Sequence, residues 1–181
     1  MPLIAMTPEV AARLRALDLT YPDVGATAGD LPDGYGRVRR SALLGSGSEV
    51  FAEAVTGLMS WQVQLGAGID VCASAPTPAP GTNVMLRVGV GPLRVGAPCR
   101  VVYVIDQPGR RGFAYGTLAG HQESGEEAFV ISQDADGTVA LSITAFSRPA
   151  TLLARAAGPF GRVVQHQITG RYLRALKTGR R

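Results

Sequence analysis

Apolar and polar side chains alternate with a period of two along the middle of the chain. A period of two places every second side chain on the same face of a β-strand. Gly, Pro and Asp residues separate the alternating segments, and Asp136-Gly137 is a strong signal for a tight hairpin turn. The pattern therefore predicts consecutive antiparallel strands at 82–90, 98–106, 112–118, 126–132 and 138–146, with further strands at 37–44 and 69–74.

Helical periodicity marks three other parts of the chain. Thr7 and Ser48 are expected N-caps, and Pro8 suits the first helical position. Apolar positions from 150 to 178 step by three, four or five residues, as on an amphipathic helix with a basic outer face. Gly158-Pro159 should kink this last helix near its start. We therefore expect helices at 7–18, 48–64 and 150–178, with a turn-rich segment at 20–35.

The order of these elements predicts the fold. It runs helix, strand, helix, about six strands and a long helix, and a curved antiparallel sheet needs apolar cover on one face. We expect an α+β helix-grip fold, in which a curved antiparallel sheet of about six or seven strands wraps around a long C-terminal helix. Residues 1–181 would form one domain, with 1–18 as an N-terminal helical extension and 150–178 as the C-terminal helix. An ordinary α+β sandwich with a filled interior is the alternative.

Composition narrows the class of protein. Hydrophobic residues make up 46% of the chain and charged residues 18%, which excludes disorder over most of its length. No apolar run reaches the ~18 residues of a membrane-spanning helix, and the N-terminus lacks the pattern of a signal peptide, so a cytoplasmic protein is expected. Cys72 and Cys99 form no C-x-x-C unit, so we expect two small buried hydrophobes rather than a disulfide framework or a zinc site.

Positive charge is concentrated at the C-terminal end. The net charge is +4, yet residues 148–181 hold eight basic side chains and no acidic one. This end is either the solvated face of the terminal helix or a surface for an anionic partner such as a membrane. Aromatic residues make up only 6% of the chain and the predicted strands carry few arginines, so no nucleic-acid partner is expected.

The densest cluster of polar side chains lies at 115–127, between two predicted strands. It contains His121, whose ordinary pKa of ~6.5 suits acid–base chemistry. The alternation places Glu127 on the face of Phe129, while Glu126 points the other way. If the Phe129 face is the interior, Glu127 is expected to have a raised pKa or an arginine partner, for which Arg100 and Arg148 are available. Alternatively, these glutamates have no role in chemistry and only stabilise the fold, by capping the turn or pairing with surface arginines.

Other chemistries find little support in the sequence. There is no H-E-x-x-H motif, and the second histidine, His166, is expected at the surface or rim of the terminal helix, so no metal site is predicted. Gly-x-Ser-x-Gly is absent, which argues against a nucleophilic serine. Gly45-Ser46-Gly47 lacks the Gly-Lys-Ser/Thr that completes a phosphate-binding loop. We therefore expect no cofactor.

Five segments carry a resemblance to a known family. They are LTYPDVGAT at 19–27, GAPCRVVYV at 96–104, GFAYGTLAGHQESGEEAF at 112–129, AFSRPATLLAR at 145–155 and ITGRYLRAL at 168–176. These segments resemble the bacterial and plant family catalogued as domain of unknown function 1990, also called uncharacterised protein family 0548. Proline is usual in that family where this chain has Ala119 and Gln122.

The resemblance implies a helix-grip fold of the START and pollen-allergen-like superfamily, also called SRPBCC. That superfamily includes lipid carriers, hormone receptors and polyketide cyclases, and a plant relative has been described as a chloroplast outer-envelope pore protein. The family supplies no accepted catalytic residues that could be carried over to this chain. Because a fold does not decide a function, the function must be argued from the site.

Our leading hypothesis is a protein that binds a small hydrophobic or amphipathic molecule in a cavity between the sheet and the C-terminal helix. The residues expected to line the ligand are Tyr103, Phe113, Tyr115, His121, Glu127 and Phe129. The alternative is an enzyme of cyclase, dehydratase or isomerase type acting on a polyketide-like or terpenoid substrate. In that case His121 and Glu127 would be acid and base, with Tyr115 as hydrogen-bond donor. A third hypothesis is a role at a membrane surface or in a pore through the basic C-terminal end.

Overall fold

The computed structural model describes residues 2–89, 94–150, 170–173 and 175 of the chain. Eight strands form one sheet in the order β1-β3-β4-β5-β6-β7-β8-β2. All neighbouring strands are antiparallel except β1, which runs parallel to β3. The strands are β1 (Ile4–Ala5), β2 (Gly36–Ser46), β3 (Asp70–Ala73), β4 (Asn83–Val88), β5 (Val95–Gln107), β6 (Arg110–Thr117), β7 (Glu123–Gln133) and β8 (Thr138–Pro149).

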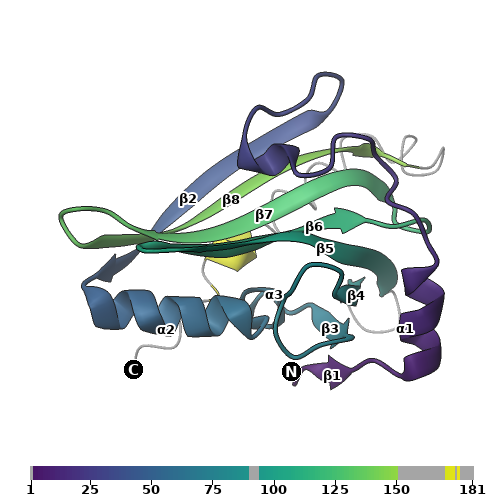
Figure 1. Cartoon of the computed structure of the whole chain (residues 1–181), viewed down its shortest axis with the longest axis horizontal. Helices are drawn as coiled ribbons and strands as arrows, with labels where there is room; N and C mark the ends of the chain where they lie inside the picture. The colour runs from purple at the N-terminus through teal and green to yellow at the C-terminus, as the bar shows by residue number, and fades with distance from the viewer. Residues whose placement is uncertain (1, 90–93, 151–169, 174, 176–181) are drawn as a thin grey trace.

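Helices lie mainly on one side of this sheet. The sheet curves over α2 and α3, which lie beneath its concave face (Figure 1). Residues 170–173 and 175 are helical as well, and the rest of the helix expected at 150–178, including Gly158-Pro159, lies outside the described residues. The helices with full bounds are α1 (Pro8–Arg15), the short 3-10 helix η1 (Ala26–Ala28), α2 (Ser48–Met59) and α3 (Gln62–Gly66).

The predicted succession of antiparallel strands is confirmed, while the expected number of six or seven strands is too low. The additional strand is β1, whose two residues are too few to show any periodicity. The single helix expected at 48–64 is wrong as well, because Trp61 interrupts it with a φ of 64° in the left-handed region. Two helices therefore meet at an elbow, with α2 on one side of Trp61 and α3 on the other.

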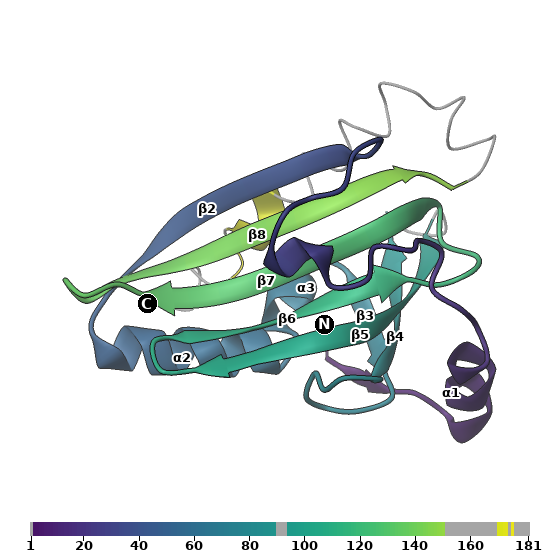
Figure 2. The ribbon, with the colours of Figure 1, turned by 45° about the horizontal axis from the view of Figure 1, so that its top comes forward.

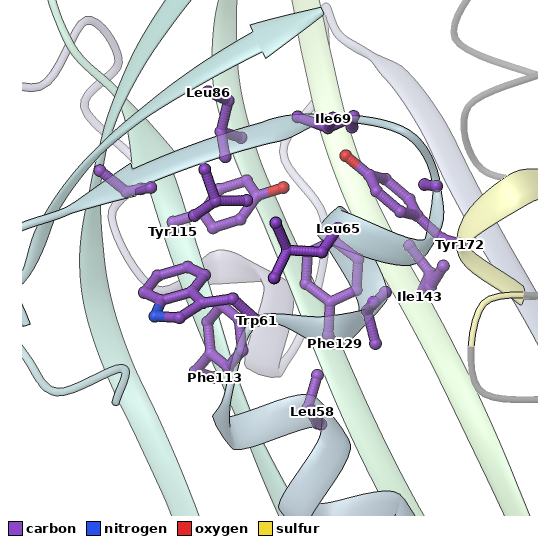
Figure 3. Close-up of a cluster of buried hydrophobic side chains, with 14 of the residues drawn as sticks. Leu58, Trp61, Leu65, Ile69, Leu86, Phe113, Tyr115, Phe129, Ile143 and Tyr172 are labelled. Carbon is purple, nitrogen blue, oxygen red and sulfur yellow. The ribbon is translucent and has the colours of Figure 1, made fainter. Parts of the chain in front are cut away.

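The main core lies between the concave face of the sheet and α2 and α3. Phe113 on β6 and Phe129 on β7 are fully buried there, with ring centroids 5.7 Å apart. Trp61 packs edge-on against Phe113 with a centroid separation of 5.2 Å, and Leu58 fills the space below them (Figure 3). Burying a large apolar side chain contributes about 1.5–3 kcal/mol, so these residues hold the helices against the sheet.

The opposite, outer face of the sheet is covered by residues 16–35, which we call the N-terminal strap. This segment crosses the strands on the side away from α2 (Figure 2). It is attached by a bridge between Leu19 and Leu118, and the ring of Tyr35 packs edge-on against Phe146 of β8 at 5.1 Å. Because both faces of the central strands are covered, side chains on either face can be buried.

A β-bulge in β5 changes the face to which one predicted residue points. The register shifts between Val101, which pairs with Tyr115, and Tyr103, which pairs with Ala114. The unbroken alternation expected over 98–106, which would place Tyr103 on the same face as Val101, is therefore wrong, because the extra residue of a bulge reverses the alternation. Tyr103 lies on the outer face, where its hydroxyl is 2.8 Å from Oγ1 of Thr27 in the N-terminal strap.

Candidate functional site

The candidate site is centred on Glu127, on the concave face of β7. In the register of the sheet, Glu127 lies between Tyr115 on β6 and Ala145 on β8. It shares its face with Phe129, two residues further along, which belongs to the main core. A carboxyl group therefore lies among apolar side chains, on the face that the period-two alternation predicted.

Burial governs the protonation of Glu127. It raises the pKa of this carboxyl group to about 7, although the hydrogen bond from Tyr115 acts in the opposite direction. The Tyr115 hydroxyl donates that bond to Oε2 of Glu127 over 2.9 Å. The ion pairs of the described part of the chain, Arg37–Asp33, Arg94–Asp70 and Arg111–Asp106, lie elsewhere. Near neutral pH, Glu127 is therefore populated in both its acid and its carboxylate form.

Tyr172 and Cys99 complete the polar groups of this face. The hydroxyls of Tyr115 and Tyr172 point toward one another, and the Tyr172 ring packs edge-on against Phe129 at 5.1 Å (Figure 3). Burial, reinforced by the negative charge of Glu127, raises the pKa of both phenols and of the Cys99 thiol. Both phenols therefore remain protonated and can act as hydrogen-bond donors. We call these four residues the Glu127 cluster.

Glu126, the residue before Glu127, has a different environment on the outer face. Its carboxylate accepts hydrogen bonds from the Tyr21 hydroxyl at 2.7 Å, the Gly25 N–H at 2.6 Å, and both the N–H and the hydroxyl of Thr27. These donors come from the N-terminal strap and satisfy a side chain that is only 3% exposed. Glu126 therefore fixes the strap to the sheet and takes no part in the concave site.

This attachment explains two of the sequence segments that carry the family resemblance. The segment 19–27 supplies the donors, and the segment 112–129 supplies Glu126. Gly25 has a φ of 88°, a left-handed conformation that glycine adopts without strain. At Gly116 a Cβ atom would overlap the Tyr21 hydroxyl, so only glycine lets that ring lie close to the sheet.

His121 lies apart from Glu127. It follows β6 in the turn, where its Nδ1 accepts a hydrogen bond of 2.9 Å from the N–H of Glu123. Burial lowers the pKa of His121 to about 4, so the ring is neutral at pH 7 and stabilises the turn. Four strand positions separate Glu123 from Glu127, which corresponds to about 13 Å. The structure does not bring His121 beside Glu127, and the other histidine, His166, lies outside the described residues.

The two arginines available as partners for Glu127 have other roles. Arg100 donates to the carbonyl oxygens of Leu14 at 2.6 Å and Leu17 at 3.0 Å, which satisfies backbone groups at the end of α1. Arg148 lies over the ring of Tyr35, with 4.7 Å between its guanidinium carbon and the ring centroid. Neither therefore neutralises the charge of Glu127.

Sequence reasoning placed Phe113, Tyr115, Glu127 and Phe129 on one face, and the structure brings them together there. It overlooked Tyr172, although this residue lies on the apolar side of the amphipathic pattern expected at 150–178. Cys99 was interpreted only as a buried hydrophobe, and its alternation with Val101 was the signal that it faces the interior. Where the helix holding Tyr172 would dock could not be derived from spacing.

Two features of the described residues bear on the class of protein. None of the described helices is both long and apolar enough to span a membrane. Nor do three or more His, Cys, Asp and Glu side chains gather into a possible metal site within the described ranges. Most of the basic segment 148–181 lies outside those ranges, so the structure places no surface for an anionic partner there.

Solved structures similar to this chain support the fold. A hypothetical protein from Helicobacter pylori aligns over 91% of this chain and 96% of its own, with a TM-score of 0.61 and 10% identity. A START superfamily protein from Mycobacterium smegmatis aligns over 81% of this chain and 97% of its own, with a TM-score of 0.55 and 14% identity. The structure of Ara h 8.0201 gives the same coverage at a TM-score of 0.55 and 13% identity. These likenesses show a START-like α+β fold with a large curved sheet.

Sequence relatives show the family. A protein of uncharacterised family 0548 from Deinococcus radiodurans is 32% identical over 97% of this chain and 94% of its own length. A protein of the same family from Arabidopsis thaliana is 31% identical over 74% of this chain and 67% of its own. The model of the domain of unknown function 1990 matches residues 20–175. The chain therefore belongs to the family defined by that domain.

Proposed function

We propose that this chain binds a small amphipathic molecule against the concave face of the sheet, beside the C-terminal helix. The observation that carries the proposal is Glu127, a buried carboxyl group whose described hydrogen-bond partner is the neutral phenol of Tyr115. Burying a charge without a counter-charge is destabilising, so a protein that has only to fold gains nothing from it. Apolar surroundings with a few convergent polar groups are typical of ligand sites.

The surroundings of the Glu127 cluster support the same interpretation. Tyr115 and Tyr172 are only 5% and 3% exposed, and Glu127 as a whole residue is half-buried. Burial of the carboxyl group raises its pKa. A titratable group whose pKa is strongly perturbed and that has a specific partner is a recurring property of functional sites.

The chemistry of the cluster favours a headgroup that donates hydrogen bonds. An ammonium group would supply the positive charge that Glu127 lacks, and a hydroxyl would donate to its carboxylate. A carboxylate headgroup would meet a negative charge and two phenols. We therefore expect affinity to fall from an alkylamine, through the alcohol, to the carboxylic acid of the same chain length.

Displacement of a fluorescent probe tests the proposal. The full chain is titrated with Nile red, an uncharged dye that brightens in apolar sites, and the probe is then displaced with decylamine, 1-decanol or decanoic acid. We expect displacement at pH 7.5 in that order of affinity. Glu127→Gln removes the charge but keeps the shape, so it should weaken decylamine binding about tenfold, a loss of ~1.4 kcal/mol.

The matched control is Glu53→Gln, which changes an exposed glutamate of α2 and should leave all affinities unchanged. Unaltered decylamine affinity in the Glu127→Gln variant would remove this residue from the site. Failure of all three compounds to bind the wild-type chain would contradict the proposed function itself.

One observation favours an acid–base enzyme as a second candidate. A carboxyl group with a pKa of about 7 is suited to exchange protons near neutral pH, and Tyr115 could donate a hydrogen bond to a substrate carbonyl. Only Glu127, rather than a pair with His121, would then exchange the proton. Incubation with 2-tetralone, a ketone of polyketide-like shape, in deuterated buffer should give Glu127-dependent deuterium uptake. Uptake that persists in Glu127→Gln would contradict this candidate.

A further inference from the structure

Trp61, at the elbow between α2 and α3, is strained and incompletely hydrogen-bonded. Its φ of 64° is costly for a bulky residue, and the side chain is fully buried. The indole Nε1–H has no hydrogen-bond partner within the described part of the chain. Packing explains the ring, since it lies against Phe113, but it explains neither the strain nor the unused donor.

Gln64, three residues further along, is also fully buried, and its side-chain amide is unpaired. Neither its Oε1 nor its Nε2 makes a hydrogen bond with any residue that the structure describes, and Gln64 is 0% exposed. At ~100° per residue, Gln64 lies on the opposite side of α3 from the exposed Gln62 and Gly66. Its amide is therefore directed into the protein.

Unpaired buried polar groups are rare in native proteins, because each loses its bonds to water and gains none in return. Leucine or methionine would fill the volume of Gln64 without that penalty. Gln64 and Trp61 lie within one turn, and both have unpaired buried polar groups. Trp61 also has a strained backbone. Neither the unpaired groups nor the strain stabilises the fold. Violations of this kind are expected at functional sites.

The elbow lies beside the proposed ligand site. Leu65 of α3 lies close to Tyr115 and Phe129 in the core (Figure 3). The ring of Phe113 packs against both Trp61 and Tyr115, with centroid distances of 5.2 Å and 6.0 Å. Helix α3 also approaches Ala175 so closely that a Cβ on Gly66 would lie 2.8 Å from Cβ of Ala175.

We propose that Gln64 and Trp61 bind a hydroxyl group of the ligand, at the opposite end from the Glu127 cluster. A hydroxyl has one proton to donate and two lone pairs that accept. Gln64 Oε1 can accept that proton, while Gln64 Nε2–H and Trp61 Nε1–H can donate to the lone pairs. An ether or a carboxylate lacks the proton, and an ammonium group lacks the lone pairs. The inference rests on the proposed function and adds the ligand class: an apolar molecule that carries an alcohol.

Trp61 supplies a direct readout, because it is the single tryptophan of the chain. Its emission is recorded while the full chain is titrated with 11-amino-1-undecanol, whose ammonium group can meet Glu127 while its hydroxyl reaches the elbow. The comparison compound is 10-methoxydecylamine, which has the same number of heavy atoms but no hydroxyl proton. We expect the amino alcohol to shift the emission and to bind about tenfold more tightly than the ether. Gln64→Leu should abolish this difference, whereas Glu127→Gln should weaken both compounds and retain it.

Thermal unfolding of the ligand-free protein gives a second readout. Gln64→Leu removes unpaired polar atoms, so it should raise the melting temperature, while Gln62→Leu on the exposed side of α3 serves as the control. A lower melting temperature with unchanged binding of the amino alcohol would mean that the amide holds a buried water only, and would overturn the inference.

The remaining outcomes separate the two proposals. Equal binding of the amino alcohol and its methyl ether by wild type and Gln64→Leu would overturn the hydroxyl site while leaving the proposed function in place. Absence of binding by decylamine, the amino alcohol and the ether would reject both, since the hydroxyl site needs a ligand in the interior.

Discussion

Glu126 and Glu127 are consecutive residues of β7 whose carboxyl groups lie on opposite faces of one sheet. Glu126 accepts hydrogen bonds from Tyr21, Gly25 and Thr27, whereas the described bond of Glu127 comes from Tyr115. The same side chain therefore has two roles, set by what covers each face. On the outer face a carboxylate anchors the N-terminal strap, and on the concave face we propose that a carboxyl group contacts a ligand.

The anchoring role predicts a loss of stability in Glu126→Gln. An amide nitrogen would replace one acceptor oxygen and would face donors from the strap, and unpaired buried groups cost about 1–3 kcal/mol each. We expect the free energy of unfolding in urea to fall by about 2–4 kcal/mol. Probe binding on the concave face should be unchanged, with Glu53→Gln as the exposed control. Unaltered stability would show that the strap is held by other contacts.

Because the Tyr21 ring lies close to Gly116, we expect the stability losses of substitutions at these two residues to be non-additive. Gly116→Ala would place a Cβ against the Tyr21 hydroxyl and push the strap away, and overpacking typically costs about 1–3 kcal/mol. In Tyr21→Ala the ring is absent, so Gly116→Ala should add little to the loss already present. A double-mutant cycle by urea unfolding measures this coupling. Additive losses would contradict the steric explanation.

The raised pKa of Glu127 predicts how stability changes with pH. Its value of about 7 in the folded chain exceeds the ordinary 4.5, so the folded state holds a proton that the unfolded chain releases. The contribution is fully present below pH 4.5 and is lost as pH rises through 7, by up to about 3 kcal/mol. The lowered pKa of His121 acts in the opposite direction between about 4 and 6.5. Wild type should therefore be compared with Glu127→Gln, whose relative stability should increase from pH 5 to 8.

Tyr115→Phe should change the titration of Glu127 in a known direction. The Tyr115 hydroxyl donates to Glu127 and so lowers the pKa of that carboxyl group. Without the bond, the pKa should rise further above 7, which carboxyl infrared absorption can follow in a pH titration. Decylamine affinity at pH 7.5 should decrease, because more of Glu127 is then neutral. An unchanged titration midpoint would show that burial alone sets the protonation.

The period-two pattern was sufficient to predict the strands from β4 to β8, because every second residue of each strand contacts the core. It could not predict the bulge at Tyr103, since an extra residue leaves no mark in the alternation of apolar and polar side chains. Nor could the sequence predict the left-handed conformation of Trp61, because the usual indicator of that conformation is a glycine, and this position has a tryptophan. His121 and Glu127 are close in the sequence, but they are distant in the structure because the strand between them is extended.

The N-terminal strap also has a mechanical consequence. Helix α2 on one side and residues 16–35 on the other leave the middle of β6 and β7 shielded from water on both faces. Their backbone hydrogen bonds can open only if the strap or the core is displaced first, so amide hydrogens there should exchange most slowly. We therefore expect the central strands to be the most rigid part of the structure. Any movement that admits a molecule to the concave face must come from the helices, which meet that face without backbone pairing.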